Sequence, residues 1–88
     1  MARLDMGGEM GSMAVAQPSP ESFFELGLIY STGREVAADL IAAHKWFNLA
    51  AVKGNRAAAS HRQELAREMS ATDVAEAQRA AREWLSRH

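Results

Sequence analysis

The chain has no cysteine, few aromatic residues and almost no net charge. Without cysteine it has neither a disulfide framework nor a thiolate metal site, and a thiol nucleophile is excluded. Ten basic residues against 11 acidic ones give a net charge of -1, so no large field of one sign attracts nucleic acid or an anionic membrane. Aromatic residues make up 7%, whereas 18 of the 88 residues are alanine, which favours closely packed helices over a sheet. We therefore expect one small all-α domain.

Long apolar runs are also lacking. Between Met1 and Ala16, charged residues and glycines interrupt every apolar stretch, so no continuous core of a secretory signal is present. Nothing in the sequence approaches the length of a membrane span. The Gly, Met, Ala and Ser composition, with no sustained period, predicts a flexible leader over residues 1–18, and whether it becomes ordered on binding is left open. The expected location is the cytoplasm.

Apolar periodicity and capping residues together predict four helices. Ser19 suits an N-cap and Pro20 the first helical position, while Asn55 and Ser70 stand as caps before the third and fourth periodic segments. The predicted helices span about residues 20–32, 38–53, 56–69 and 71–86. Because the connections are short, we expect two antiparallel hairpins, residues 19–54 and 55–88, that form a fragment of an α/α solenoid.

Small residues at helical spacing predict close packing between the first two helices. Gly27 has no Cβ where the second helix must approach, and Ala43 and Ala50 let the two backbones come together. Gly33 stands where a left-handed helix cap is needed. The sequence also carries a weak internal repeat. A step of 34 residues places Asp39 over Asp73 and keeps the helical period, although side-chain sizes do not repeat. A repeat length near 34 residues is within the range of helix-turn-helix solenoid units.

A family pattern lies on the first hairpin. Its residues are Leu26, Gly27, Tyr30, Gly33, Asp39, Ala43, Trp46, Ala50, Ala51 and Gly54. The pattern resembles the repeat signature of the Sel-one-like repeat family, relatives of the tetratricopeptide repeats, over about residues 23–58. The resemblance implies a helical adaptor between other proteins without catalytic chemistry. Residues 55–88 resemble the degenerate C-terminal hairpin of bacterial members, which implies a capping hairpin.

No arrangement of residues predicts catalysis, a metal or a cofactor. The three histidines, His44, His61 and His88, do not have the spacing of a zinc-binding helix motif, and no serine has a nucleophile-elbow context. We expect His44 to be partly solvated. Along the third helix, His61 is placed to contact Glu64 one turn away.

Two glutamates one helical turn apart, Glu64 and Glu68, have the spacing of an acid and base pair. Arg62 and Arg67 interleave with them, which favours a charged solvent face instead. The sequence therefore predicts a protein that is not an enzyme.

The favoured function is a protein-interaction adaptor or accessory subunit. Apolar residues near the edge of the first helix are left to meet a partner, and two hairpins alone leave the ends of the stack uncovered. The predicted partner-binding residues are Phe24, Leu28, Ile29 and Trp84. The expected partner is another protein, a multiprotein complex or a second copy of the chain.

Nucleic-acid binding is the alternative. The arginines that would carry it are Arg56, Arg62, Arg67, Arg79, Arg82 and Arg87. Residues 55–88 hold these six arginines against five acidic residues, so this stretch has a balance of only +1. Such mixed charge makes a phosphate-binding surface the less favoured reading.

Overall fold

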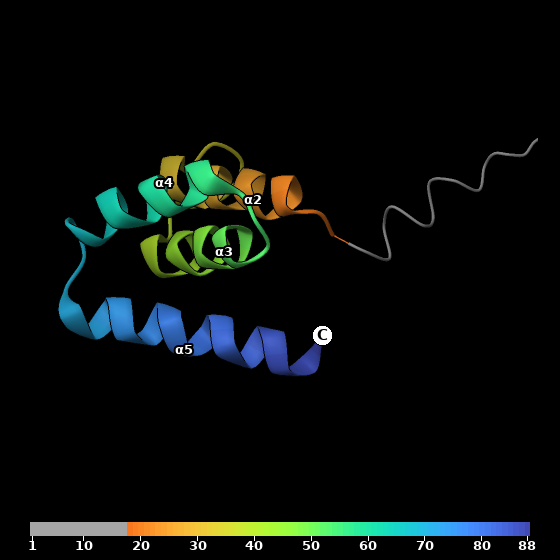
Figure 1. Ribbon diagram of the computed structural model, residues 1–88. Helices are drawn as coiled ribbons and strands as arrows, with labels where there is room; N and C mark the ends of the chain where they lie inside the picture. Colours follow the sequence, from red (N-terminus) through yellow and green to blue (C-terminus); the bar gives the residue numbers. More distant parts are fainter. Residues whose placement is uncertain (1–17) are drawn as a thin grey trace, which may run out of the picture.

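The structure is a computed structural model that describes residues 18–88, and these form four helices and no strand (Figure 1). The helices are α2 (Pro20–Thr32), α3 (Leu40–Val52), α4 (Arg56–Ala66) and α5 (Ala71–Arg87). Successive helices run in opposite directions, as the ribbon shows (Figure 1). The predicted all-α class is confirmed. Of the predicted leader, only Pro18 belongs to the described residues, and it is exposed.

At the start of each helix, the side chain of a capping residue accepts a hydrogen bond from a backbone amide of the first turn. The Oγ of Ser19 accepts a hydrogen bond from the amide of Ser22 at 3.1 Å, and the Oδ1 of Asp39 accepts one from the amide of Ala42 at 3.1 Å. Asn55 and Ser70 cap α4 and α5 in the same way. The second helix starts two residues later than predicted, because Asp39 is extended, with φ -149° and ψ 101°, and acts as the cap.

Local backbone hydrogen bonds also explain where two of the helices end. Gly33 adopts the left-handed conformation, with φ 71° and ψ 24°, and its amide donates to the carbonyl of Ile29 at 3.0 Å, as predicted for a glycine cap. The third helix ends three residues earlier than expected. After Ala66 the amides of residues 67–69 donate to carbonyls only three residues back, so the helix tightens into turns before α5 begins.

The second helix, α3, is the centre of the fold. The other three helices all pack on it, and α4 and α5 each contact α3 more closely than they contact one another. In Figure 1, α3 lies between α4 and α5. Its buried residues are Ala43, His44, Phe47, Leu49 and Ala50. The apolar stripe that the sequence predicts for this helix contains neither His44 nor Leu49, because a stripe describes one buried face and α3 is covered on several. The residues of that stripe are Leu40, Ala43, Trp46, Phe47, Ala50 and Ala51.

The closest packing joins α2 to α3 at Gly27. A Cβ built on Gly27 would overlap the ring of Phe47, which is 1% exposed and cannot swing into solvent. Glycine is therefore required for this helix approach, as the sequence predicts. The start of α3 is tied to the end of α2 as well, since the amide of Asp39 donates to the carbonyl of Tyr30 at 3.0 Å.

Candidate partner-binding groove

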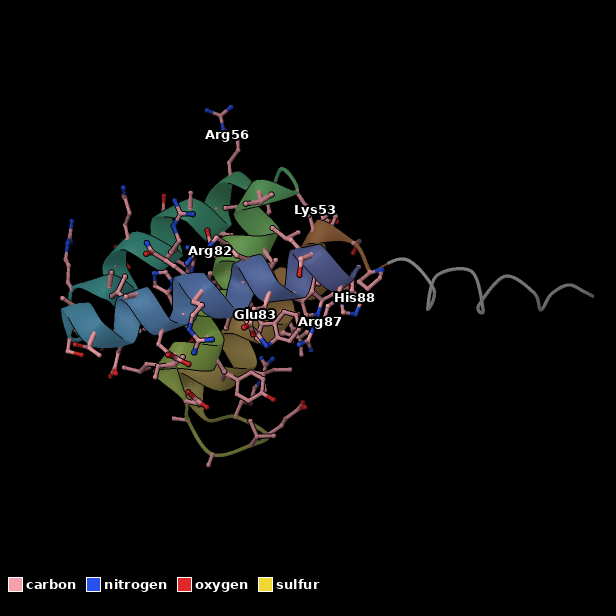
Figure 2. All side chains as sticks on the ribbon, turned by 90° about the horizontal axis from the view of Figure 1, so that it is seen from below. Lys53, Arg56, Arg82, Glu83, Arg87 and His88 are labelled. Atoms are coloured by element: carbon pink, nitrogen blue, oxygen red, sulfur yellow. The ribbon has the colours of Figure 1, made fainter. Side chains whose placement is uncertain are left out.

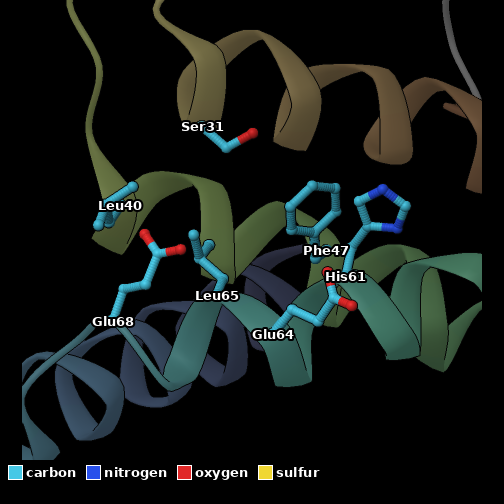
Figure 3. Close-up of a pocket in the computed structure, with 7 residues that line it drawn as sticks. All are labelled: Ser31, Leu40, Phe47, His61, Glu64, Leu65 and Glu68. Carbon is cyan, nitrogen blue, oxygen red and sulfur yellow. The ribbon is translucent and has the colours of Figure 1, made fainter.

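A groove of about 220 Å³ opens between α2 and α4, with α3 as its floor (Figure 3). The residues that line it are Ser31, Leu40, Phe47, His61, Glu64, Leu65 and Glu68. Its floor is apolar and its rim is polar. Small-molecule sites are commonly about 300–1,000 Å³, so a groove of this size suits one or two side chains of a larger ligand.

Helical spacing brings the α4 residues of the groove together. His61 and Leu65 lie four residues apart on one face of α4, and Glu68 follows in the turn after the helix ends. Leu65 is buried among the core residues, which fixes the rotation of α4 and leaves the other two at the rim. The opposite wall is Ser31, whose hydroxyl donates to the carbonyl of Leu28 at 3.2 Å within α2.

An aromatic contact lies at the His61 side of the groove. The ring of His61 meets Phe24 edge to face, with centroids 5.0 Å apart, and lies 5.3 Å from the ring of Phe47. Its Nδ1 lies 3.0 Å from the carbonyl of Ala57, to which a protonated Nδ1 donates. The expected pairing of His61 with Glu64 is not seen, because the imidazole turns toward α2 and α3 instead of along its own helix (Figure 3).

The two rim carboxylates, Glu64 and Glu68, are exposed. Within residues 18–88 neither forms an ion pair. Arg62, which was expected to interleave with them on a solvent face, donates instead from Nη1 to the Oδ1 of Asn48 on α3 at 2.6 Å. The rim of the groove therefore carries more negative charge than the alternation of arginine and glutamate in the sequence suggests.

The predicted partner-binding residues are all partly buried. Phe24, Leu28 and Trp84 pack against the core, and Ile29 keeps a partly open position on α2. The structure brings Phe24 close to the groove, through its contact with His61. Sequence reasoning did not name the groove residues as a set, although the apolar Phe47 and Leu65 and the acidic rim were each recognisable on their own helices.

Trp84 lies away from the groove, where it joins α5 to the first hairpin. Its ring meets Phe23 edge to face at 5.1 Å and lies 6.2 Å from Trp46, while Phe23 and Trp46 stack at 5.7 Å. The ring of His88 stacks on Trp84 at 4.0 Å. Trp84 thus fastens the last helix to α2 and α3.

The prediction that His44 is partly solvated is wrong. Its side chain is 2% exposed, and within the described residues its Nδ1 has no hydrogen-bond partner. Burial lowers the pKa of His44, and the nearby positive charge of Arg62 lowers it further. His44 is therefore a neutral core residue at pH 7. The periodicity of apolar residues does not predict this burial, because it assigns polar residues such as histidine to the solvent side of the helix.

The arginines of α4 and α5 do not form one continuous basic surface. Arg79 pairs with both Glu76 and Glu83, and Arg62 is held by Asn48. Arg56, Arg67, Arg82 and Arg87 are exposed. Figure 2 shows Arg56 standing far from α5, on which Glu83 lies near Arg82 and Arg87. Acidic side chains thus interrupt the basic ones on α5.

The residues of the family pattern mostly serve packing. Ala43 and Ala50 are fully buried, and Gly27 lies under Phe47. Asp39 caps α3, and both Gly33 and Gly54 have positive φ, 71° and 111°. The others are partly buried, and they are Leu26, Tyr30, Trp46 and Ala51.

The described part of the chain contains neither a metal-binding cluster nor a membrane-spanning helix. Among residues 18–88, no three His, Asp or Glu side chains come together as a metal site would require. Within the same range, no helix has both the length and the apolar character needed to span a membrane. Comparison of the chain with models of protein families, with curated proteins and with solved structures finds no match.

Proposed function

We propose that this protein is a non-catalytic protein-interaction module whose groove between α2 and α4 receives a segment of another polypeptide. The observation that carries the proposal is the groove itself, with an apolar floor of Leu40, Phe47 and Leu65 and a polar rim. Leu40 is the partly exposed apolar side chain of this floor, because Phe47 and Leu65 are buried, so polar contacts at the rim would carry much of the recognition.

The resemblance to Sel-one-like repeats supports the same function from an independent direction, because adaptors of that kind hold other proteins. The last helix supports the accompanying role of a cap. Its exposed residues are polar or small, including Glu76, Gln78 and Arg82, except for Leu85, which is 37% exposed. A polar outer face is what the terminal unit of a helical stack needs.

Nucleic-acid binding has less support than protein binding. A phosphate-binding surface needs clustered, unpaired cations, whereas Arg79 is engaged by two glutamates and Arg62 by Asn48. Binding of the intact protein to DNA or RNA that weakens steeply with salt would favour this alternative.

Two adjacent residues at the end of α2 provide a test of the groove. Ser31 lines it, whereas Thr32 is exposed and is not among the lining residues. Ser31→Trp fills the groove, and Thr32→Trp adds the same side chain outside it. Proteins that co-purify with the tagged full chain from its source cell are compared for the unmodified protein and both variants, after circular dichroism confirms that the variants are folded.

The proposal expects at least one polypeptide to be lost with Ser31→Trp and kept with Thr32→Trp. A small diazirine amino acid at position 31 should crosslink to that same polypeptide at one segment, and the same probe at position 32 should not. Equal recovery with both tryptophan variants, or no crosslink from position 31, would contradict the proposed role of the groove.

A further inference from the structure

We propose that two copies of this chain exchange their last helices. In the exchanged pair, α4 and α5 of each copy join into one continuous helix through residues 67–70, and the α5 part packs on α3 of the other copy. The inference goes beyond the proposed function and does not rest on it, because it starts from α5 and its connection to α4 and not from the groove.

The connection between α4 and α5 lacks the glycines that follow the earlier helices. The turns after α2 and α3 each contain a glycine with positive φ, Gly33 at 71° and Gly54 at 111°. Residues 55–88 contain neither glycine nor proline. Residues 67–69 are Arg, Glu and Met, whose helix propensities are close to that of alanine. No residue type in this connection therefore prevents α4 from continuing into α5.

The backbone of the connection is already close to helical where it leaves α4. Arg67 has φ -67° and ψ -22°, and the amides of residues 67–69 donate to carbonyls three residues back. Ser70 is extended instead, with ψ 158°, and its hydroxyl oxygen accepts the amide of Asp73 as the cap of α5. A rotation at Ser70 and a loosening of the turn before it would complete one helix over residues 56–87, about 48 Å long.

Polar contacts do not tie α5 to the other helices in the described chain. Within residues 18–88, the hydrogen bonds and ion pairs of its side chains all lie inside α5 and the residue that follows it. By contrast, α4 is tied to α3 by the hydrogen bond of Arg62 to Asn48 and by the amide of Asn55, which donates to the carbonyl of Ala50. In this part of the chain, release of α5 therefore separates apolar contacts and breaks no hydrogen bond between helices.

The apolar contacts that hold α5 can all be made by a second copy. Ala77 and Ala81 are buried where α5 packs on α3, and the ring of Trp84 meets that of Phe23 edge to face at 5.1 Å. Release of α5 alone would leave these surfaces in water, which costs free energy. The α5 of another copy has the same residues, so an exchange restores these contacts in both copies. The occupant of the vacated face is therefore a second copy and not an unrelated protein.

The directions of the helices let the exchange close as a symmetric pair. In Figure 1, α4 and α5 lie on opposite sides of α3 and run in opposite directions. A two-fold rotation about an axis perpendicular to this layer reverses the helix directions and also exchanges the two sides. The joined helix of one copy, which leaves along the α4 side of its own α3, then meets the α5 side of the other copy's α3 in the direction that α5 requires. Both copies gain the same contacts, so the pair is closed.

Three variants of the full chain distinguish this exchange from ordinary association. Ser70→Ala removes the cap of α5, which only the turn uses, and alanine favours the joined helix. Ser19→Ala makes the same change at the cap of α2, which both states keep. Ala71→Pro fits the first position of α5, where the amide hydrogen is not needed, and it breaks a continuous helix.

Light scattering after size-exclusion chromatography measures monomer and dimer over a range of concentrations, and circular dichroism checks that each variant is helical. The unmodified chain should form a dimer whose fraction rises with concentration. Ser70→Ala should strengthen dimerisation about 25-fold, which is about fivefold for each of two turns. Ser19→Ala should leave dimerisation unchanged, and Ala71→Pro should abolish it.

A mixed sample of isotope-labelled and unlabelled copies identifies the helix that is exchanged. An isotope-filtered nuclear Overhauser effect should appear between the ring of Phe23 in one copy and the ring of Trp84 in the other. A dimer without this contact, equal dimerisation of Ser70→Ala and Ser19→Ala, or a dimer of Ala71→Pro would each overturn the inference. An unmodified chain that stays monomeric at every concentration would overturn it as well.

Discussion

Nη1 of Arg62 donates a hydrogen bond of 2.6 Å to Oδ1 of Asn48, and this contact fastens α4 to α3. It also holds a permanent positive charge close enough to His44 to lower the pKa of that buried imidazole. Two features that look unremarkable in the sequence, an arginine on a polar helix and a histidine beside an apolar stripe, are thus coupled in the core.

Stability should fall as the pH falls through the histidine range. The pKa of His44 is lowered in the folded state, so between that lowered value and 6.5 the unfolded chain binds more protons than the folded chain does. The contribution of His44 to the free energy of unfolding is therefore complete above pH 6.5 and is lost progressively below it. Thermal melts from pH 8 to pH 5 should show this loss, and His44→Leu should flatten it. The double variant His61→Gln and His88→Gln, which changes only exposed rings, should keep it.

Removal of the charge of Arg62 should raise the pKa of His44. Arg62→Gln takes away the positive neighbour and leaves the burial of the imidazole largely in place. The measurement is an NMR titration of the ring protons of His44. An unchanged or lower pKa in the variant would show that the two groups are not coupled. The variant should also lose about 1 kcal/mol of stability with the hydrogen bond to Asn48.

Gly27→Ala should destabilise the protein by about 1–3 kcal/mol, because its new methyl group overlaps the ring of Phe47. Helix propensity alone predicts that Gly27→Ala stabilises the protein, since alanine has a higher helix propensity than glycine. Chemical denaturation distinguishes the two. Adding Phe47→Leu to Gly27→Ala should cost less than the sum of the two single changes, and strict additivity would argue against the overlap.

Asp39→Ala should cost about 0.5–2 kcal/mol through loss of the cap of α3. Asp39→Asn retains an oxygen that accepts the amide of Ala42, so it should cost much less. Unfolding in urea measures both. Equal losses for the two variants would mean that the charge of Asp39, and not its capping hydrogen bond, stabilises the start of the helix.

The helices themselves were largely predictable because their signals are local. Ser19, Asn55 and Ser70 were each identified as caps, and Gly33 as a left-handed end, from nearby residues alone. The length of α4 was not predictable in this way, since its periodicity continues to Met69 although the backbone tightens after Ala66. A periodic pattern does not specify where a hydrogen-bonding pattern changes.

The groove was less predictable than the helices, because it depends on which side of each helix meets its neighbours. The stripe on α3 implied one buried face, whereas three helices surround α3 and bury His44 and Leu49 as well. Glu64 and Glu68 were recognised as a pair, but the turn of Arg62 toward Asn48 that leaves them unbalanced is a tertiary event. Sequence spacing fixes neighbours within a helix and says little about contacts between helices.

The most direct test of the account is a map of the binding site in the full chain by NMR. Titration of the isotope-labelled protein with a synthetic peptide of the segment that crosslinks to position 31 should shift the backbone amides of Ser31, Leu40, Leu65 and Glu68, and leave those of the outer face of α5, such as Gln78 and Arg82, in place. Shifts confined to α5, or spread evenly over all four helices, would contradict the claim that the groove between α2 and α4 is where another polypeptide binds.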